Sequence, residues 1–157
     1  MADDKYTVER SITMNAPAER IFEQISDFHN WPNWSPWEDV DPELKRLYSG
    51  PESGKGAVYG WSGNRKAGQG RMEITEATHP SVVHIDLQFE KPFKSHNDTV
   101  FTISSEGPES RVTWTMTGEK TFMTKVMGIF TSMDKMVGPD FEKGLDRLKT
   151  TTEKPAG

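Results

Sequence analysis

The sequence predicts an α+β domain, in which a seven-stranded antiparallel sheet wraps around one long C-terminal helix, with two short helices after the first strand. Short segments of alternating apolar residues, separated by Gly- and Pro-containing turns, run from residue 44 to residue 117. Apolar residues then recur at helical spacing over 122–148 and cover about half of a helix circumference. A stripe that wide needs a large apolar partner, and the sheet is the largest one available.

The N-terminal third begins with a strand and a helix. Residues 6–14 alternate between apolar and polar side chains, which is typical of a strand. Asn15 is a suitable helix cap, and Pro17 stands where a missing N–H costs nothing. The helical spacing of apolar residues stops near Asp27, so we expect a short helix.

A tryptophan-rich segment follows this helix. Residues 29–37 contain two prolines, which exclude a regular helix, and three tryptophans, Trp31, Trp34 and Trp37. Burying one tryptophan is worth about 2–3 kcal/mol, so the segment must pack on something. Two interpretations stand side by side: a lid or corner held against the sheet, and a set of indoles lining the mouth of a cavity.

The turns of the sheet divide into two groups. Three short turns that contain Pro51, Pro80 and Pro108 fall at one end of an up-and-down meander. The connections at the other end are longer or rich in glycine, and they cover 62–68, 90–96 and 118–121. Binding residues tend to lie on such loops, so we place the mouth of a cavity at this second end.

The predicted C-terminal helix is rich in methionine. It carries four of the eight methionines, Met123, Met127, Met133 and Met136. Methionine adapts to irregular neighbours better than leucine does. A helix of this composition over a sheet therefore suggests a cavity that holds something apolar.

Composition excludes several classes of function. The 157 residues suit a single domain spanning 1–157, and we expect its last residues, from about 150 to 157, to be frayed. The net charge is −5 and the charges are interspersed, which argues against nucleic acid as a partner. No apolar run reaches the roughly 18–20 residues that span a bilayer, so we expect no stable membrane insertion. The absence of cysteine and of a secretion signal favours a cytoplasmic location, and the oligomeric state is left open.

The sequence shows no cofactor motif, and we expect neither a cofactor nor a metal. The segment 50–56 lacks the hydroxyl residue that follows lysine in a phosphate-binding loop. His84 and Asp86 share one strand face, but it is the face opposite Ile85, so we expect a solvent-facing pair.

Four polar residues lie near the expected walls or mouth, and they are Tyr59, His96, Asp98 and Thr99. For each of them a surface or structural role is favoured over catalysis. We therefore predict no catalytic residue.

Several local sequences resemble one known superfamily. They are 16–22 (APAERIF), 31–37 (WPNWSPW), 54–63 with its Gly-x-Gly-Ala-x-Tyr-x-Trp-x-Gly pattern, 70–74 (GRMEI) and 141–148 (FEKGLDRL). Together they resemble the START/birch-pollen-allergen (SRPBCC) superfamily, in its bacterial branch of polyketide cyclase/dehydrase-like proteins. The resemblance covers residues 6 to about 150 and implies the helix-grip fold. Members of the superfamily bind lipids, sterols, polyketides or plant hormones, and some are cyclases.

We therefore expect a protein that encloses a hydrophobic or amphipathic small molecule between the sheet and the C-terminal helix. The expected ligand-binding residues are Trp37, Trp61, Met72, Ile74, Leu87, Phe89, Phe93, Phe101, Trp114, Met116, Met123, Met127 and Phe130. One alternative is a polyketide cyclase or dehydratase that uses neither metal nor nucleotide. A second is a module that binds a protein partner, like the co-chaperone members of the superfamily.

Overall fold

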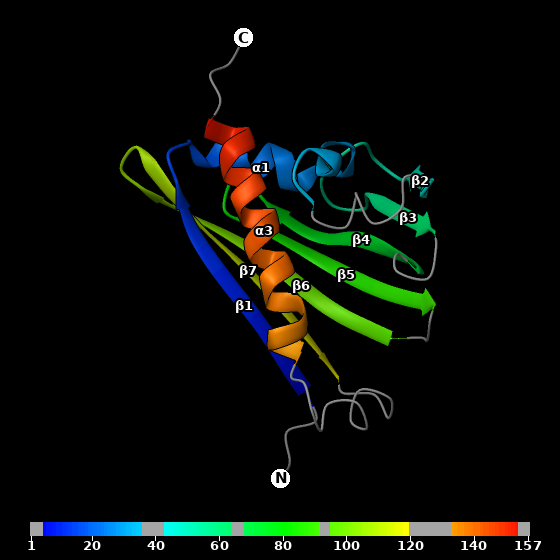
Figure 1. Ribbon diagram of the computed structural model, residues 1–157. Coiled ribbons are helices and arrows are strands. Elements are labelled where there is room, and N and C mark those ends of the chain that lie inside the picture. The colour runs from blue at the N-terminus through cyan, green and yellow to red at the C-terminus, as the bar shows by residue number, and fades with distance from the viewer. Residues whose placement is uncertain (1–4, 36–42, 64–67, 92–94, 120–132, 154–157) are drawn as a thin grey trace.

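The computed structural model describes residues 5–35, 43–63, 68–91, 95–119 and 133–153, and Figure 1 shows their arrangement. Strand β1 (Lys5–Met14) leads into helix α1 (Ala18–Ser26) and a 3-10 helix, η1 (Phe28–Asn33). Six strands follow: β2 (Lys45–Ser49), β3 (Val58–Ser62), β4 (Gln69–Thr78), β5 (Val82–Lys91), β6 (Ser95–Glu106) and β7 (Glu109–Glu119). Helix α3 (Met133–Glu153) ends the described chain.

The seven strands form one antiparallel sheet in the order β1-β7-β6-β5-β4-β3-β2. Every neighbour except the β1–β7 pair is consecutive in the chain, which is the predicted meander closed by the first strand. Helix α3 crosses the same face of the sheet that α1 and η1 cover at one end (Figure 1). The predicted α+β helix-grip architecture, with two short helices after β1, is confirmed.

Strand alternation gives the sheet two chemically different faces. The inner face, toward the helices, carries fully buried side chains such as Ile74, Ile85 and Val112. The outer face carries the residues between them, for example Thr113 and Thr115 on β7. The period-2 pattern in the sequence therefore assigned the faces correctly, because successive side chains on a strand point to opposite sides.

The tryptophan-rich segment caps the C-terminus of α1. The indole N–H of Trp31 donates to the Ile25 carbonyl at 2.9 Å, and that of Trp34 to the Gln24 carbonyl at 3.0 Å. The Asn30 side chain donates to the Glu23 carbonyl, and the Gly54 backbone N–H donates to the Ser26 carbonyl. The last four carbonyls of the helix thus all have donors, although α1 ends at Asp27 without a glycine cap.

The same two indoles also join η1 to the sheet and to α3. Trp34 meets Trp114 edge-on with ring centroids 5.6 Å apart, and Trp114 stacks on Phe141 of α3 at 4.0 Å and 5°. Phe101 contacts Trp31, Trp34 and Trp114. For Trp31 and Trp34 the interpretation as a corner held against the sheet is therefore correct, whereas Trp37 lies outside the described residues.

Helix α3 packs along β1 through a close approach at Gly138. A Cβ atom at this position would lie 2.2 Å from the Arg10 guanidinium, whose Nε donates to Glu142 at 2.8 Å. A larger residue at position 138 would therefore displace the Arg10 guanidinium from this position. Residues 120–132, which include most of the predicted methionine-rich half of this helix, lie outside the described residues.

The C-terminal end of α3 differs from the expectation of fraying from residue 150. The helix continues to Glu153, and Thr152 is buried, with its hydroxyl donating to the Leu148 carbonyl. Arg20 of α1 donates to the Thr152 carbonyl, and the Asn15 backbone N–H donates to Glu153 Oε2 at 2.7 Å. Asn15 does not cap α1, where Pro17 is the N-cap without a side-chain bond.

The indole bonds at the end of α1 predict a specific stability loss. Trp31→Phe keeps an aromatic ring but leaves the Ile25 carbonyl without its donor, so we expect a loss of about 1–3 kcal/mol in the free energy of unfolding. Urea denaturation followed by circular dichroism measures this difference. Leu47→Ala, at a side chain that is 72% exposed, is the control and should change stability by about 0.5 kcal/mol or less. Equal stability of the Trp31→Phe variant and the parent protein would contradict the capping role.

The contact between Asn15 and Glu153 predicts a pH dependence. The Asn15 backbone N–H, and then the Lys149 ammonium at 2.9 Å, hold the pKa of Glu153 below its usual value. A lowered folded-state pKa contributes stability above the usual pKa of about 4.3, and this contribution is lost as the pH falls through the folded-state pKa. Glu153→Gln should therefore melt below the parent protein at neutral pH, and the two melting temperatures should converge in acid. A melting-temperature difference that is constant with pH would contradict this origin.

Candidate functional site

The candidate site is the part of the inner sheet face that lies toward the end of the sheet holding the longer connections. The register arranges its side chains in rows across the strands. The mouth row consists of Trp61, Gly70 and Phe89. The middle row consists of Tyr59, Met72, Leu87 and Asn97. The base row consists of Ala57, Ile74, Ile85, Thr99 and Met116.

Burial increases from the mouth row to the base row. Trp61 and Phe89 in the mouth row are half-buried, as are Met72 and Leu87 in the middle row. In the base row Ile74 and Ile85 are fully buried, and Met116 is 6% exposed. Apolar side chains that point inward yet stay half-buried mark a part of the inner face that is not closed.

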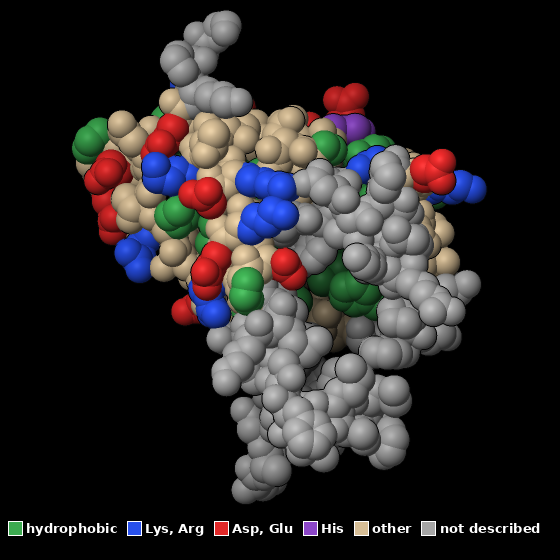
Figure 2. Space-filling model, in the orientation of Figure 1, with side chains coloured by type: hydrophobic (Ala, Val, Ile, Leu, Met, Phe, Trp, Pro, Cys, Tyr) green, Lys and Arg blue, Asp and Glu red, His purple; other side chains and the backbone are tan. Residues whose placement is uncertain are grey.

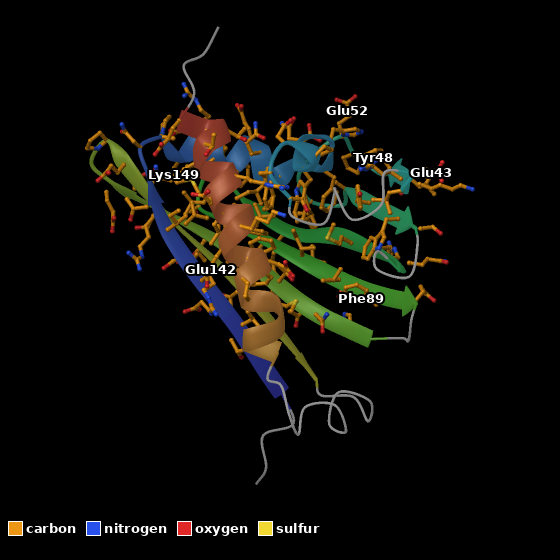
Figure 3. All side chains as sticks on the ribbon, viewed as in Figure 1. Glu43, Tyr48, Glu52, Phe89, Glu142 and Lys149 are labelled. Atoms are coloured by element: carbon orange, nitrogen blue, oxygen red, sulfur yellow. The ribbon has the colours of Figure 1, made fainter. Side chains whose placement is uncertain are left out.

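The figures show the same asymmetry. Helix α3, over its described residues, crosses β1 and β7. Strands β3 and β4 and the C-terminal half of β5 extend beyond it (Figure 1). In the space-filling view, hydrophobic side chains form the base of a recess on this side of the molecule (Figure 2). Phe89 lies in the corresponding part of β5 in Figure 3. The recess therefore lies over the part of the sheet that carries Phe89.

Gly70 shapes the mouth row. It stands between Trp61 and Phe89 in the register, and a Cβ atom there would lie 2.4 Å from the Gln88 carbonyl oxygen and 2.7 Å from the Trp61 ring. Because glycine leaves this space free, the rings of Trp61 and Phe89 meet across β4 with centroids 5.5 Å apart at 85°. The mouth row is thus a preformed aromatic surface.

Polar groups on this face are few and neutral. Asn97 and Thr99 of β6 are both about 5% exposed and lie next to Leu87 and Ile85 of β5. Among the described residues of the mouth, middle and base rows, no carboxylate or imidazole occurs. The predicted position of His96 and Asp98 near the walls or mouth is wrong: both lie on the outer face, because they alternate with Asn97 and Thr99.

The predicted ligand-binding residues fall into three groups. Four of them come together in the mouth and middle rows, and they are Trp61, Met72, Leu87 and Phe89. Four others belong to the closed core, and they are Ile74, Phe101, Trp114 and Met116. The remaining five, Trp37, Phe93, Met123, Met127 and Phe130, lie outside the described residues. Contact with a ligand stays a prediction for all thirteen.

Sequence reasoning missed two features of this face. Asn97 lies two residues before Thr99 on β6, in the same alternating series as Phe101 and Ile103. This alternation is the signal that identifies it as inward-facing. The role of Gly70 had no local signal, since it depends on Trp61 and Phe89 meeting across a third strand.

A separate hollow of about 220 Å³ lies beside the β2–β3 turn. Phe28, His29, Tyr48 and Glu52 line it, and the His29 ring stacks on Tyr48 with centroids 4.1 Å apart. His29 Nδ1 lies 2.8 Å from Asp27 Oδ1, which also accepts the His29 backbone N–H. The Asp27 side chain thus caps the N-terminus of η1. The contacts of His29 with Asp27 and Tyr48 account for the shape of this hollow.

The sheet, the crossing helix and the partly open apolar inner face define a helix-grip protein. The chain belongs to the family described as polyketide cyclase / dehydrase and lipid transport, whose model matches residues 5–153. This membership confirms the SRPBCC resemblance, and it places the chain among proteins with ligand-binding or cyclase functions in general. No curated protein matches the sequence.

Solved structures with little sequence identity share the fold. A protein from Chromobacterium violaceum is 11% identical with a TM-score of 0.68, and the alignment covers 95% of this chain and 98% of that one. Norcoclaurine synthase from Thalictrum flavum, solved with dopamine and hydroxybenzaldehyde, is 10% identical with a TM-score of 0.68, covering 97% and 90%. The di-domain aromatase/cyclase BexL of the BE-7585A biosynthetic pathway is 11% identical with a TM-score of 0.67. The alignment covers 98% of this chain and 52% of BexL.

Within the described part of the chain, no helix is both long enough and apolar enough to cross a membrane.

The geometry at Gly70 predicts the effect of filling it. Gly70→Ala should push the Trp61 ring away from Phe89, with a stability loss of about 1–3 kcal/mol and a change in the near-ultraviolet circular dichroism of tryptophan. Gly60→Ala is the matched control on β3, because its added Cβ would meet nothing closer than 3.7 Å. If the two alanine variants gave the same stability and spectra, the aromatic contact across β4 would not depend on Gly70.

Proposed function

We propose that this protein binds a hydrophobic or amphipathic small molecule in the recess between the mouth and middle rows of the sheet and the C-terminal helix. The ligand class is lipid-, polyketide- or aromatic-like. Since the sequence contains no cysteine, a reducing, cytoplasmic location fits this proposal.

The observation that carries the proposal is the half-burial of four large apolar side chains that point inward. Trp61, Met72, Leu87 and Phe89 lie together on the inner face, yet they are not buried like Ile74 and Ile85 in the base row. Covering such side chains with an apolar ligand is favourable by about 25 cal/mol for each Å² of apolar surface removed from water.

A further feature favours a ligand with a polar group. Asn97 places an amide beside Leu87 in the middle row, and small-molecule sites commonly combine apolar walls with a few such groups. Neutral donors and acceptors suit a hydroxyl or carbonyl of the ligand.

A cyclase or dehydratase is the second candidate, supported by the family description. Such an enzyme needs a group that transfers a proton, held at the reacting atom. The Tyr59 phenol, which is 4% exposed in the middle row, is the candidate for this role on the described inner face. Tyr59→Phe separates the two functions, since it should leave binding of an apolar probe intact and abolish turnover of a polyketide substrate.

A fluorescence titration tests the binding function. A fluorescent fatty acid and an aromatic probe should each bind saturably with one site per chain. Phe89→Ala should weaken binding about tenfold, because removing most of one ring contact is worth about 1.4 kcal/mol.

Leu47→Ala is the control for this titration, because Leu47 is exposed on the edge strand β2. Its binding curve should match that of the parent protein. The proposal fails if neither probe binds saturably, or if Phe89→Ala binds both probes as tightly as Leu47→Ala does.

A further inference from the structure

The outer face of the sheet, opposite the proposed ligand recess, carries a mixed cluster of nitrogen and oxygen donors. Asp86 lies on β5, and His96 and Asp98 lie on β6. One ligand atom of each side chain lies within 4.8 Å of the others. This group is an imidazole with two carboxylates, which is a donor set rather than a patch of like charge.

The strand register holds these groups together. Asp86 stands directly opposite Asp98 in the β5–β6 pair, and His96 stands opposite Gln88, one step along the same face. Strand β6 also pairs with β7 in unbroken register, and β5 pairs with β4 without a shift from Gly70 to Ile74, the stretch that lies opposite Asp86 and Gln88. The donors therefore stand on a rigid surface and need only side-chain rotation to converge.

The facing carboxylates are unfavourable for the protein alone. Like charges directly opposite on neighbouring strands destabilise a sheet. Glu73 extends the row, since it faces Asp86 from β4, but Arg71 Nη2 pairs with Glu73 at 3.3 Å. The unfavourable pair is thus Asp86 with Asp98.

The hydrogen bonds around the pair orient Asp86 and leave Asp98 open. Gln88 Nε2 donates to Asp86 Oδ2 at 3.0 Å, while His96 Nε2 contacts Asp86 Oδ1. For Asp98, the structure of the described residues shows neither a hydrogen bond nor an ion pair. A cation between Asp98, Asp86 and His96 would use the carboxylate that is open and would offset the repulsion between the two.

We propose that Asp86, His96 and Asp98 bind one divalent transition-metal ion, of which Zn²⁺ is the representative. One imidazole nitrogen and two carboxylate oxygens suit Zn²⁺ better than Ca²⁺ or Mg²⁺, which prefer oxygen ligands alone. Two carboxylates neutralise the charge of the ion, and water completes its coordination because the His96 side chain is 62% exposed. This site is independent of the recess on the inner face.

Isothermal titration calorimetry of the full chain with Zn²⁺, after removal of metals by a chelator, tests the proposal. We expect one ion per chain with a dissociation constant in the micromolar range. Asp98→Asn and His96→Gln should each weaken binding about tenfold or more. Asp98→Asn also removes the repulsion with Asp86, so without metal it should melt at least as high as the parent protein, which shows that it folds.

His84→Gln is the matched control, because His84 lies on the same face of β5, two residues from Asp86, and outside the cluster. It should bind Zn²⁺ like the parent protein, and nuclear magnetic resonance should show Zn²⁺ shifting the ring signals of His96 but not those of His84. The proposal is overturned if Zn²⁺ does not bind, if Asp98→Asn binds it unchanged, or if Ca²⁺ binds as tightly and His96→Gln has no effect. The last result would show an acidic patch without a metal site.

Discussion

The fold depends on one aromatic cluster that ties four separate elements together. Trp34 of the tryptophan-rich segment, Phe101 and Trp114 of the sheet, and Phe141 of α3 contact one another through their rings. The same segment caps α1 with two indole N–H groups. Because a buried aromatic ring contributes both area and geometry, this cluster fixes where the helices cross the sheet.

That fixed crossing explains why the inner face is closed at one end and open at the other. Helices α1 and α3 and the segment 28–35 meet over the base of the sheet, where Ile74, Ile85 and Val112 are fully buried. Beyond this region the sheet continues, and Trp61 and Phe89 stay half-buried. One side of a single sheet therefore serves as a core at one end and as a recess at the other. Its outer side is free to carry charged groups such as Asp86 and Asp98.

Much of the architecture could be predicted from the sequence because it follows from local periodicity. Alternation on β5 and β6 assigned Ile85 and Phe101 to the inner face of the sheet, where both are buried, and Gly- and Pro-containing turns gave the meander. The predictions differ from the structure where contacts between residues distant in the chain determine it. Thr152 and Glu153 stay helical because they accept hydrogen bonds from Arg20 and Asn15. No sequence pattern near residue 150 predicts those contacts. The candidate site was predicted in part. Strand alternation identifies the residues that face inward, but it does not say which of them remain uncovered by the helices.

By itself the sequence determined the class of the protein, the faces of the strands, the superfamily and the apolar character of the interior. Each of these is a property of patterns that repeat within a few residues. Only the tertiary structure decided that Trp31 and Trp34 are helix caps, that Gly70 allows two rings to meet across a strand, and that Asp86 faces Asp98. These are contacts between residues far apart in the chain, and their distances are set by strand register and helix crossing, which no local pattern encodes.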